Sequence, residues 1–592
     1  MTSSFRSLLG AARDRVLGDL RADPYLRYLL LLATVLAAFW FWHRIPNFAT
    51  RDEMSRILDA LVPYARVLEE PSLESLRSGV VWGRVPFGAT TLLYGLLLLP
   101  VVAVAAVGES SIAAIAFPDP EFGFYAAWAE TPAWVWEWSI GIVRLANVVF
   151  AVGSVYLTYR LGTAIADRWT GRLGALLLTV TFGFLTIAHE GGEDMPATFF
   201  VLLTLVLLVE YLETGADWPL LGASAAGGLA IGFKLTAAPI VLVIGIGALL
   251  RAVRTPGSLR EQFQPRLVVT GALLGLVVIL LSFPTALVGR LDLVVGRILG
   301  GSIGRATHPT GPDALILWWF LRGYASGLGL PLLLGAVGGT VGSLAHLRRR
   351  PDGTGGILLV LSTLVGYVLL FSTWHDFRVH HLLPTFPLFA LLIAWAMARS
   401  RDRVPGLVRG LAVLLVVTSG LYAGVGVAGY ADMPRDDAAQ WLEANAEPGE
   451  EVEVYRRHLQ DTAVAHSVPV VHAFGAFREE ELDPCPAYIQ LGYRDLLYMQ
   501  DGTYFRSGPV RGSYVRNLIE GDLGYAVAAE FGPRPPDYLP QRATPGDYGD
   551  LLRYGVVPQT DQYADEQELR PNQYTLILER TEDCDPDRYP PF

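Results

Sequence analysis

The chain has 592 residues, of which 52% are hydrophobic and 17% are charged, and its mean hydropathy is +0.37. Soluble domains carry about 25% charged residues, so the apolar excess points to lipid rather than to one large core. The net charge is unevenly divided, because residues 1–430 hold 27 acids and 32 bases and residues 431–592 hold 30 acids and 14 bases. A soluble enzyme, a coiled coil, a disordered scaffold and a nucleic-acid binder are therefore disfavoured, the last because no basic face offsets the acidic tail.

The composition predicts a polytopic α-helical membrane protein with a soluble α/β domain at its C-terminus. Apolar runs long enough to cross about 30 Å of hydrocarbon predict about eleven crossings. The runs begin near Tyr28, Trp138, Leu173, Pro196, Pro219, Ala237, Leu267, Ala325, Ile357, Leu383 and Leu411.

Arginine clusters between these runs predict which loops face the cytoplasm, because short cytoplasmic loops accumulate basic residues. The clusters lie in residues 1–27, 160–172, 251–266, 348–350 and 399–409. Every second gap then lies on the outer face of the cell membrane, which groups residues 45–137, 189–195, 284–313 and 372–381. We accordingly expect a cytoplasmic segment (1–27), a multi-pass catalytic domain (28–430) with a long first external loop, and an extracytoplasmic domain (431–592).

One apolar run, residues 87–107, does not fit this alternation. Counting it as a single crossing would invert every later loop and place the arginine clusters outside. We therefore interpret it as a re-entrant or interface-lying helix within the long external loop.

The acidic tail alternates helical and strand patterns. Residues 435–446 predict a helix, and residues 452–455, 468–473, 488–491 and 574–578 predict strands. The only two cysteines, Cys485 and Cys584, both lie in this tail. In an extracytoplasmic domain they can close a loop of about 100 residues as a disulfide, and two unpaired thiols are the alternative.

The ionisable residues at the predicted outer face are the candidates for chemistry. Lys234 stands out because it is the only lysine of the chain and interrupts an apolar stretch. Inserting a charge at that depth into a membrane costs roughly 3 kcal/mol unless the charge reaches water or an anion. A snorkelling side chain is one explanation, and a compact cation that binds phosphate is the other.

Two acidic pairs reach the same face. Asp52 and Glu53 open an amphipathic stretch, and Glu193 and Asp194 precede the helix at Pro196. Such carboxylates can act as a general base, orient an acceptor or hold a divalent cation, although helix starts also favour acids for electrostatic reasons.

His189 and Glu190 add candidate acceptor or metal ligands at this face, but the chain has no zinc spacing. It also lacks a Walker A sequence and a CxxC pair. The predicted cytoplasmic loops are too short for a nucleotide domain. No cofactor is therefore required by the sequence, and a divalent cation is the one alternative.

The order of these motifs resembles the GT-C glycosyltransferases that use polyprenyl-phosphate sugars, in the protein O-mannosyltransferase and aminoarabinose-transferase branch. The resemblance covers roughly residues 45–400. It rests on the following residues: Asp52-Glu53, Val143-Arg144-Leu145, Tyr159-Arg160-Leu161, Asp167-Arg168-Trp169, Asp194-Met195-Pro196, Gly232-Phe233-Lys234 and Arg378-Val379-His380-His381-Leu382-Leu383-Pro384 with Pro387.

The resemblance implies an inverting sugar transfer on the outer face of the membrane. Asp52 is then the general base for the acceptor hydroxyl, and Asp194 with Glu193 positions the acceptor or pairs with cations. Lys234 and Arg378 are the implied cations for the leaving lipid phosphate, with His380 or His381 as hydrogen-bond donors. The implied partners are a polyprenyl- or dolichyl-phosphate sugar, an acceptor that is a protein, glycan or glycolipid, and the lipid bilayer.

Two other classes remain open from the sequence. A transporter or lipid-glycan flippase places its charged sites near the bilayer midplane and often shows inverted repeats, whereas here the charges gather at one face. A membrane anchor for the acidic tail would have no functional need for Asp52 or Lys234.

Overall fold

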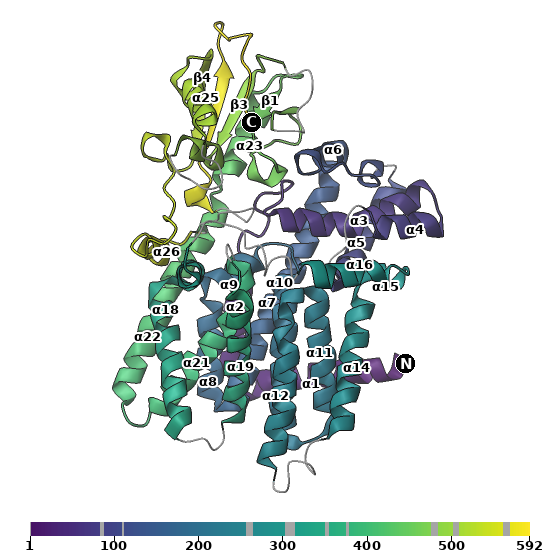
Figure 1. The fold of residues 1–592 in the computed structure, drawn as a ribbon, viewed down its shortest axis with the longest axis vertical. Coiled ribbons are helices and arrows are strands. Elements are labelled where there is room, and N and C mark those ends of the chain that lie inside the picture. Colours follow the sequence, from purple (N-terminus) through teal and green to yellow (C-terminus); the bar gives the residue numbers. More distant parts are fainter. Residues whose placement is uncertain are drawn as a thin grey trace.

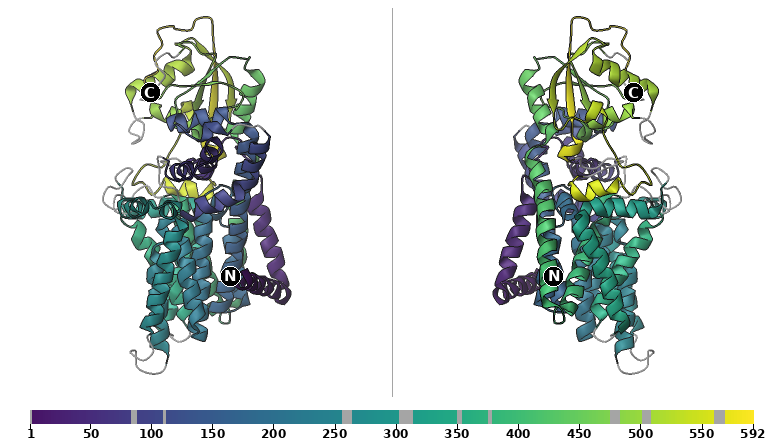
Figure 2. Two further views of the ribbon diagram at one scale, coloured as in Figure 1. Left: turned by 90° about the vertical axis from the view of Figure 1, so that its right-hand side faces the viewer. Right: turned by 90° about the vertical axis from the view of Figure 1, so that its left-hand side faces the viewer.

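A bundle of long helices forms one end of the molecule and a small β-sheet domain forms the other (Figure 1). This computed structural model describes residues 2–82, 88–108, 112–255, 264–301, 314–349, 354–374, 378–474, 483–500, 508–559 and 569–592. The bundle contains α2 (Pro24–Ala38), α7 (Ala133–Ile165), α8 (Arg168–Thr179), α9 (Phe182–Ala188), α10 (Asp194–Thr214), α11 (Asp217–Phe233), α12 (Pro239–Arg254), α14 (Pro265–Ser282), α18 (Ile316–Arg349), α19 (Gly355–Phe371), α21 (Phe386–Ser400) and α22 (Pro405–Ala428). The N-terminal α1 (Thr2–Ala22) lies roughly at right angles to these helices (Figures 1 and 2).

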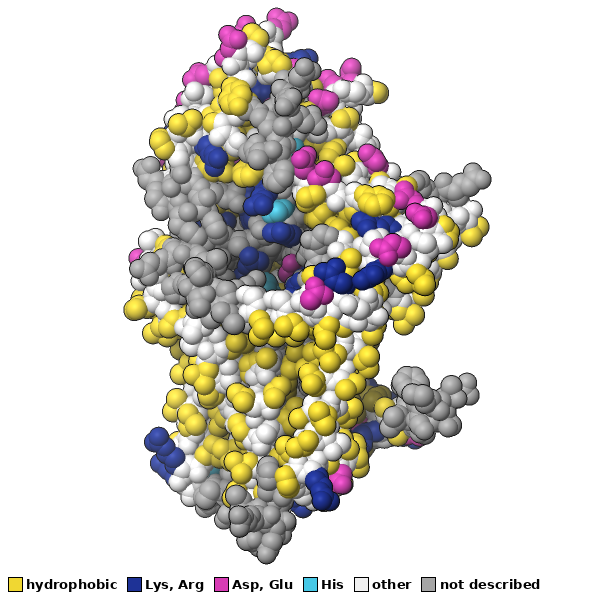
Figure 3. All heavy atoms as spheres, turned by 45° about the vertical axis from the view of Figure 1, so that its right-hand side comes forward, with side chains coloured by type: hydrophobic (Ala, Val, Ile, Leu, Met, Phe, Trp, Pro, Cys, Tyr) yellow, Lys and Arg dark blue, Asp and Glu magenta, His cyan; other side chains and the backbone are white. Residues whose placement is uncertain are grey.

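Every one of the predicted apolar runs is helical. Within the described residues, eight helices are long and apolar enough to cross a membrane, or nine when the bent pair α8 and α9 is taken as one span. The predicted count of about eleven crossings was therefore too high by this measure. The reason is length, because α2, α11 and α19 have only 15, 17 and 17 residues. The space-filling view shows hydrophobic side chains over the outside of the bundle and charged side chains toward its two ends, as expected for a multi-pass membrane protein (Figure 3).

Further helices form a layer between the bundle and the sheet domain. They are α3 (Arg51–Glu69), α4 (Leu73–Val80), α5 (Gly88–Val107), α6 (Tyr125–Glu130), α15 (Pro284–Leu287), α16 (Leu291–Gly296), α20 (Val379–Leu382) and α26 (Leu551–Val556). This layer also contains the short turn η3 (Leu235–Ala237) after α11 and the turn η5 (Leu383–Thr385) after α20.

The helix α5 is the apolar run that did not fit the loop alternation. It is one of the eight helices that are long and apolar enough to cross a membrane. It lies beside α3, whose Tyr64 hydroxyl donates to the Gly95 carbonyl of α5 (2.9 Å). It also lies beside the loop before α10, because the Tyr94 hydroxyl of α5 donates to the Gly192 carbonyl (3.2 Å). It further contacts α7, α11, α14 and α15.

The C-terminal domain contains a five-stranded sheet in the order β2-β1-β3-β5-β4. Its strands are β1 (Val452–Val454), β2 (Val470–His472), β3 (Tyr488–Gly492), β4 (Tyr525–Phe531) and β5 (Thr575–Arg580), and its helices are α23 (Pro434–Asn445), α24 (Tyr493–Leu496) and α25 (Pro509–Glu520). Strand β1 pairs in parallel with β2 and β3, whereas β5 pairs antiparallel with β3 and β4. The predicted helix and four predicted strands are confirmed, and β4 and α25 were not predicted.

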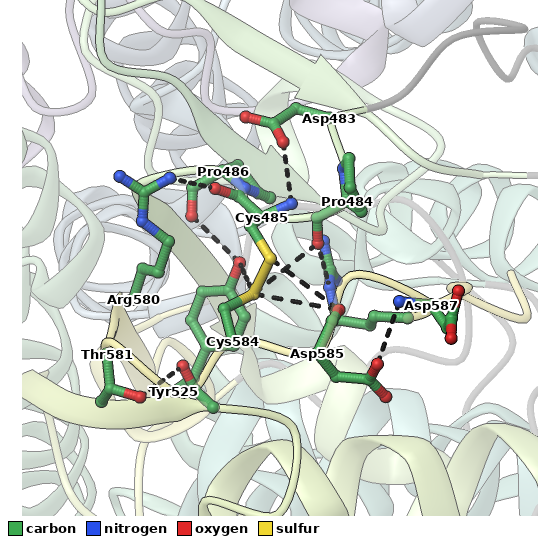
Figure 4. The surroundings of a disulfide bond; sticks show 12 residues. Asp483, Pro484, Cys485, Pro486, Tyr525, Arg580, Thr581, Cys584, Asp585 and Asp587 are labelled. Carbon is green, nitrogen blue, oxygen red and sulfur yellow. Dashed lines mark hydrogen bonds between the residues drawn. A yellow bond between two sulfur atoms is a disulfide. The ribbon is translucent and has the colours of Figure 1, made fainter.

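A disulfide between Cys485 and Cys584 fastens this sheet. Figure 4 shows the bond where the approach to β3 meets the chain that leaves β5, and the two cysteines are 99 residues apart in sequence. The bond therefore closes nearly the whole length of the domain downstream of β2.

Candidate functional site

The start of α3 presents two neighbouring carboxylates in opposite environments. The Thr50 side chain caps the helix by accepting a hydrogen bond from the Glu53 backbone N–H (3.1 Å). Consecutive residues of a helix point about 100° apart, so Asp52 and Glu53 face different surroundings. The Asp52 side chain is 49% exposed, whereas that of Glu53 is fully buried.

Glu53 holds three chain segments together. Its carboxylate accepts two hydrogen bonds from the Arg144 guanidinium of α7 (2.7 and 2.8 Å), one from the Gly191 N–H (2.7 Å) and one from the Ala49 N–H (2.8 Å). Arg144 is also fully buried and donates to two carbonyl oxygens of the loop between α2 and α3. The pair thus joins α3, α7 and the loop before α10, and its oxygens are occupied by protein donors.

A second buried pair links α3 to the start of α10. Arg56 lies one helical turn after Asp52 and donates two hydrogen bonds to Glu193 (2.6 and 3.0 Å). The Arg56 guanidinium is also 3.6 Å from the Asp52 carboxylate and 3.9 Å from that of Asp59. Burial alone would raise the pKa of Glu193, but the charges of Arg56 and Lys234 lower it below its ordinary value. Glu193 is therefore an ionised carboxylate.

Lys234 completes this network from the end of α11. Its ammonium donates to the Asp194 carboxylate and lies 4.0 Å from that of Glu193, and its side chain is 11% exposed. A Cβ at Gly88, which has φ +38°, would lie 2.0 Å from the Gly232 carbonyl oxygen. The absence of a side chain at Gly88 thus lets the start of α5 approach the end of α11 beside Lys234.

These contacts form one continuous series of charges that runs from Asp52 through Arg56, Glu193 and Lys234 to Asp194. Its members come from α3, the start of α10 and the end of α11, all at the bundle end that faces the sheet domain (Figure 1). The space-filling view shows a recess between the two parts of the molecule in which basic, acidic and histidine side chains gather (Figure 3).

His189 and Glu190 lie in the loop just before this series. Both ring nitrogens of His189 face backbone carbonyl oxygens, at 2.7 Å from Leu185 and 2.8 Å from Phe39, and the ring stacks on Tyr430 with centroids 4.1 Å apart. Burial lowers the pKa of His189 to about 4, so the ring carries a single N–H at neutral pH and donates to only one of these two carbonyl groups. The backbone carbonyl of Glu190 accepts a hydrogen bond from the Asn147 side chain (2.5 Å). Both residues thus take part in packing the site against α7 and the tail.

Arg378, His380 and His381 lie on a separate element. Arg378 directly precedes α20, and His380 and His381 belong to it. The backbone N–H of Arg378 donates a hydrogen bond to Nδ1 of His381 (3.0 Å). The two histidine rings are 4.1 Å apart and both are buried. The turn η5 that follows α20 contacts α10.

A metal site was the alternative for the acids and histidines of this face. Among the residues that the structure describes, no group of three or more histidine, cysteine or acidic side chains is arranged to hold a metal ion. Sequence reasoning also missed two members of the site. Arg56 was overlooked although its position four residues after Asp52 places both on one helix face, and Arg144 was noted only within a family motif.

The sheet domain lies over this region and contacts the segment between α2 and α7. Arg44 is buried and binds Asp436 through its backbone N–H (2.9 Å) and the Thr462 carbonyl through its guanidinium (2.6 Å). On another side of the domain, the Phe122 ring stacks on His472 with centroids 4.4 Å apart. The tail is therefore joined to the helical region by both polar and aromatic contacts.

Comparison with known proteins supports the resemblance over one segment. Residues 135–283, which include Arg144, Asp194 and Lys234, match the family model described as dolichyl-phosphate-mannose-protein mannosyltransferase. This match confirms the expected resemblance to glycosyltransferases of the GT-C type for about a quarter of the chain. No curated protein matches the sequence.

Several solved structures show a distant overall likeness. The oligosaccharyltransferase AglB from Archaeoglobus fulgidus, in complex with an inhibitory peptide and a dolichol-phosphate, is 11% identical over 86% of this chain and 69% of its own, with a TM-score of 0.44. ArnT from Cupriavidus metallidurans, bound to undecaprenyl phosphate, is 12% identical over 95% of this chain and 99% of its own, with a TM-score of 0.44. The mycobacterial arabinofuranosyltransferase AftD is 16% identical over 94% of this chain and 42% of its own, with a TM-score of 0.38.

Proposed function

We propose that this protein is a membrane glycosyltransferase that moves a sugar from a polyprenyl-phosphate donor to an acceptor on the outer face of the cytoplasmic membrane, with inversion. The observation that carries this proposal is the placement of Lys234, the sole lysine, in one charge network with the half-exposed Asp52. The matched family segment supports the same reaction class. A lipid-linked donor also accounts for a catalytic site built on membrane helices.

Asp52 is the general base in this proposal. Its carboxylate is the more accessible of the two at the start of α3 and lies 3.6 Å from the Arg56 guanidinium. An acceptor hydroxyl that transfers its proton to Asp52 attacks the anomeric carbon, while the bond from that carbon to the lipid phosphate breaks. Glu53 is not assigned to chemistry, because its oxygens bind Arg144 and two backbone N–H groups.

Lys234 stabilises the negative charge that develops on the departing phosphate. An ammonium carries three N–H donors, so one can hold Asp194 while the others face the phosphate. Asp194 and Glu193 keep this ammonium at the end of α11, and Arg56 fixes Glu193 in turn. Arg378 and the α20 histidines are further candidates to bind the same phosphate.

The proposed acceptor is a molecule with a free hydroxyl group, and the proposed sugar is any that a polyprenyl phosphate carries. A protein, a glycan or a glycolipid each offers a hydroxyl nucleophile, and the recess beneath the sheet domain faces the predicted outer side (Figure 3). The sheet domain lies over that recess and is the candidate surface for acceptor recognition.

The test is a transfer assay with the full-length protein reconstituted in vesicles and given radiolabelled polyprenyl-phosphate sugars. Asp52→Asn should lower kcat by about 100-fold to 10,000-fold and leave the donor concentration for half-saturation nearly unchanged. Glu69→Gln, an exposed acid at the far end of α3, is the matched control and should keep full turnover. Lys234→Ala should instead raise the donor concentration needed.

Two results would contradict the proposal. Wild-type turnover in Asp52→Asn would remove Asp52 from the base role. Movement of a substrate across the vesicles, with no transfer from any donor, would favour a transporter.

A further inference from the structure

An apolar groove runs along the flank of the bundle formed by α18, α21 and α22. Its volume is about 1000 Å³, and its lining is dominated by leucine, valine and glycine residues. Figure 1 shows these helices on the opposite side of the bundle from α11 and α14, so the groove is separate from the Lys234 network. A cavity of this size and character suits an extended hydrocarbon chain.

Glycines of α18 shape the groove in two ways. Gly339 lies against the backbone of Ile393 on α21, where an added Cβ would come within 2.8 Å, so it sets the close contact of the two helices. A Cβ at Gly338 would instead meet no atom within 4 Å, although Gly338 lines the groove. The space above Gly338 is therefore open rather than filled by a neighbouring side chain.

The groove has a strongly basic end. Arg349 at the end of α18, Arg399 at the end of α21 and Arg403 before α22 all line it, together with His346. The described residues that line the groove include no aspartate or glutamate. Arg399 lies 5.2 Å above the Trp395 ring. Because α22 leads from this end to the sheet domain, the arginines lie at the bundle end away from that domain.

We propose that this groove is a binding site for an anionic phospholipid of the leaflet opposite the sheet domain. The acyl chains occupy the apolar channel between α18 and α22, and the phosphate lies against Arg349, Arg399 and Arg403. Guanidinium groups suit phosphate because their N–H donors match its oxygens in pairs. Basic pockets between membrane helices at the cytoplasmic side have this recognition chemistry. The inference does not depend on the glycosyltransferase proposal, since the groove lies away from Asp52 and Lys234.

A lipid-binding measurement on the purified full-length protein tests the proposal. Fluorescently tailed phosphatidylglycerol, added in detergent micelles, should bind about tenfold more tightly than the same probe built on phosphatidylcholine. The triple variant Arg349→Gln, Arg399→Gln, Arg403→Gln should abolish this preference. The charge-matched control, Arg13→Gln, Arg27→Gln, Arg409→Gln, changes three exposed arginines that do not line the groove and should keep it.

A second pair of variants tests the hydrocarbon channel. Gly338→Trp places a large side chain in the open groove and should weaken binding of both probes. Gly410→Trp is the matched control, because Gly410 on α22 also has open space around its Cβ position and does not line the groove.

Three outcomes would overturn the proposal: equal binding of the anionic and neutral probes to the wild type, an unchanged preference in the arginine triple variant, or displacement of phosphatidylglycerol by a polyprenyl phosphate with higher affinity. The last result would assign the groove to the isoprenoid chain. The arginine variants lie at the exposed end of the groove, so the test stands even if Gly338→Trp fails to fold.

Discussion

Glu53 and Asp52 are neighbours on α3, and we expect Glu53 to stabilise the fold and Asp52 to act in the reaction. Glu53→Gln removes the negative charge from a fully buried ion pair and leaves the Arg144 guanidinium uncompensated. Breaking a buried pair from one side costs about 3 to 5 kcal/mol. Asp52→Asn alters a half-exposed carboxylate whose ion pair with Arg56 spans 3.6 Å. Because solvent screens the half-exposed Asp52 and Arg56 keeps Glu193 as its buried partner, we expect this change to cost about 1 kcal/mol or less.

Thermal unfolding of the detergent-purified protein, followed by tryptophan fluorescence, measures this difference. We expect the unfolding midpoint of Glu53→Gln to fall by several degrees and that of Asp52→Asn to stay close to the wild type. The double variant Glu53→Leu, Arg144→Met should recover part of the loss, because no buried charge is then left without its partner.

Two results would refute this reasoning. A wild-type midpoint for Glu53→Gln would show that the Glu53–Arg144 pair does not hold α3 to α7. An equal fall for both single variants would show that Asp52 is as enclosed as Glu53. Activity measured on the same samples separates the roles again, since Asp52→Asn should lose turnover without losing stability.

Further predictions concern the tail, the loop before α10 and the α5 contact. Changing Cys485 and Cys584 to serine should lower the unfolding free energy of the sheet domain by about 2 to 5 kcal/mol, measured by denaturant titration. An unchanged unfolding free energy, together with the same response of both proteins to reductant, would contradict a stabilising disulfide. His189 has a depressed pKa of about 4, so the stability it contributes is complete above its unfolded pKa and is lost as the pH falls from about 6.5 to 4. His189→Gln should therefore flatten the dependence of the unfolding free energy on pH in that window, by about 3 kcal/mol at most, and an unchanged slope would contradict the assignment. Gly88→Ala should destabilise the protein and reduce donor use, because the new Cβ meets the carbonyl oxygen at the end of α11; Gly141→Ala, which meets nothing within 4 Å, should do neither.

The class of the protein and most of its helices could be predicted from the residues alone. The apolar runs are long and the hydrocarbon thickness is fixed, so the bundle could be predicted from local composition. The strands β1, β2, β3 and β5 were also visible as short apolar runs between turn residues. Strand β4 was not, because its alanine-rich residues 525–531 have low β propensity and become a strand only by pairing with β5.

The candidate site was predicted in its parts but not in its connections. Lys234 was conspicuous because it is the only lysine, and the acids at 52–53 and 193–194 stood at helix starts where sequence patterns are informative. Only the tertiary structure showed that Glu53 faces inward to Arg144 while Asp52 faces outward. Pairing between α3, α7, α10 and α11 spans up to about 180 residues of sequence from Asp52 to Lys234 and follows from helix packing, which no local pattern encodes. The sequence therefore determined which charged residues the protein keeps at one face of the membrane, and the packing of the helices decided which of them remain accessible for chemistry.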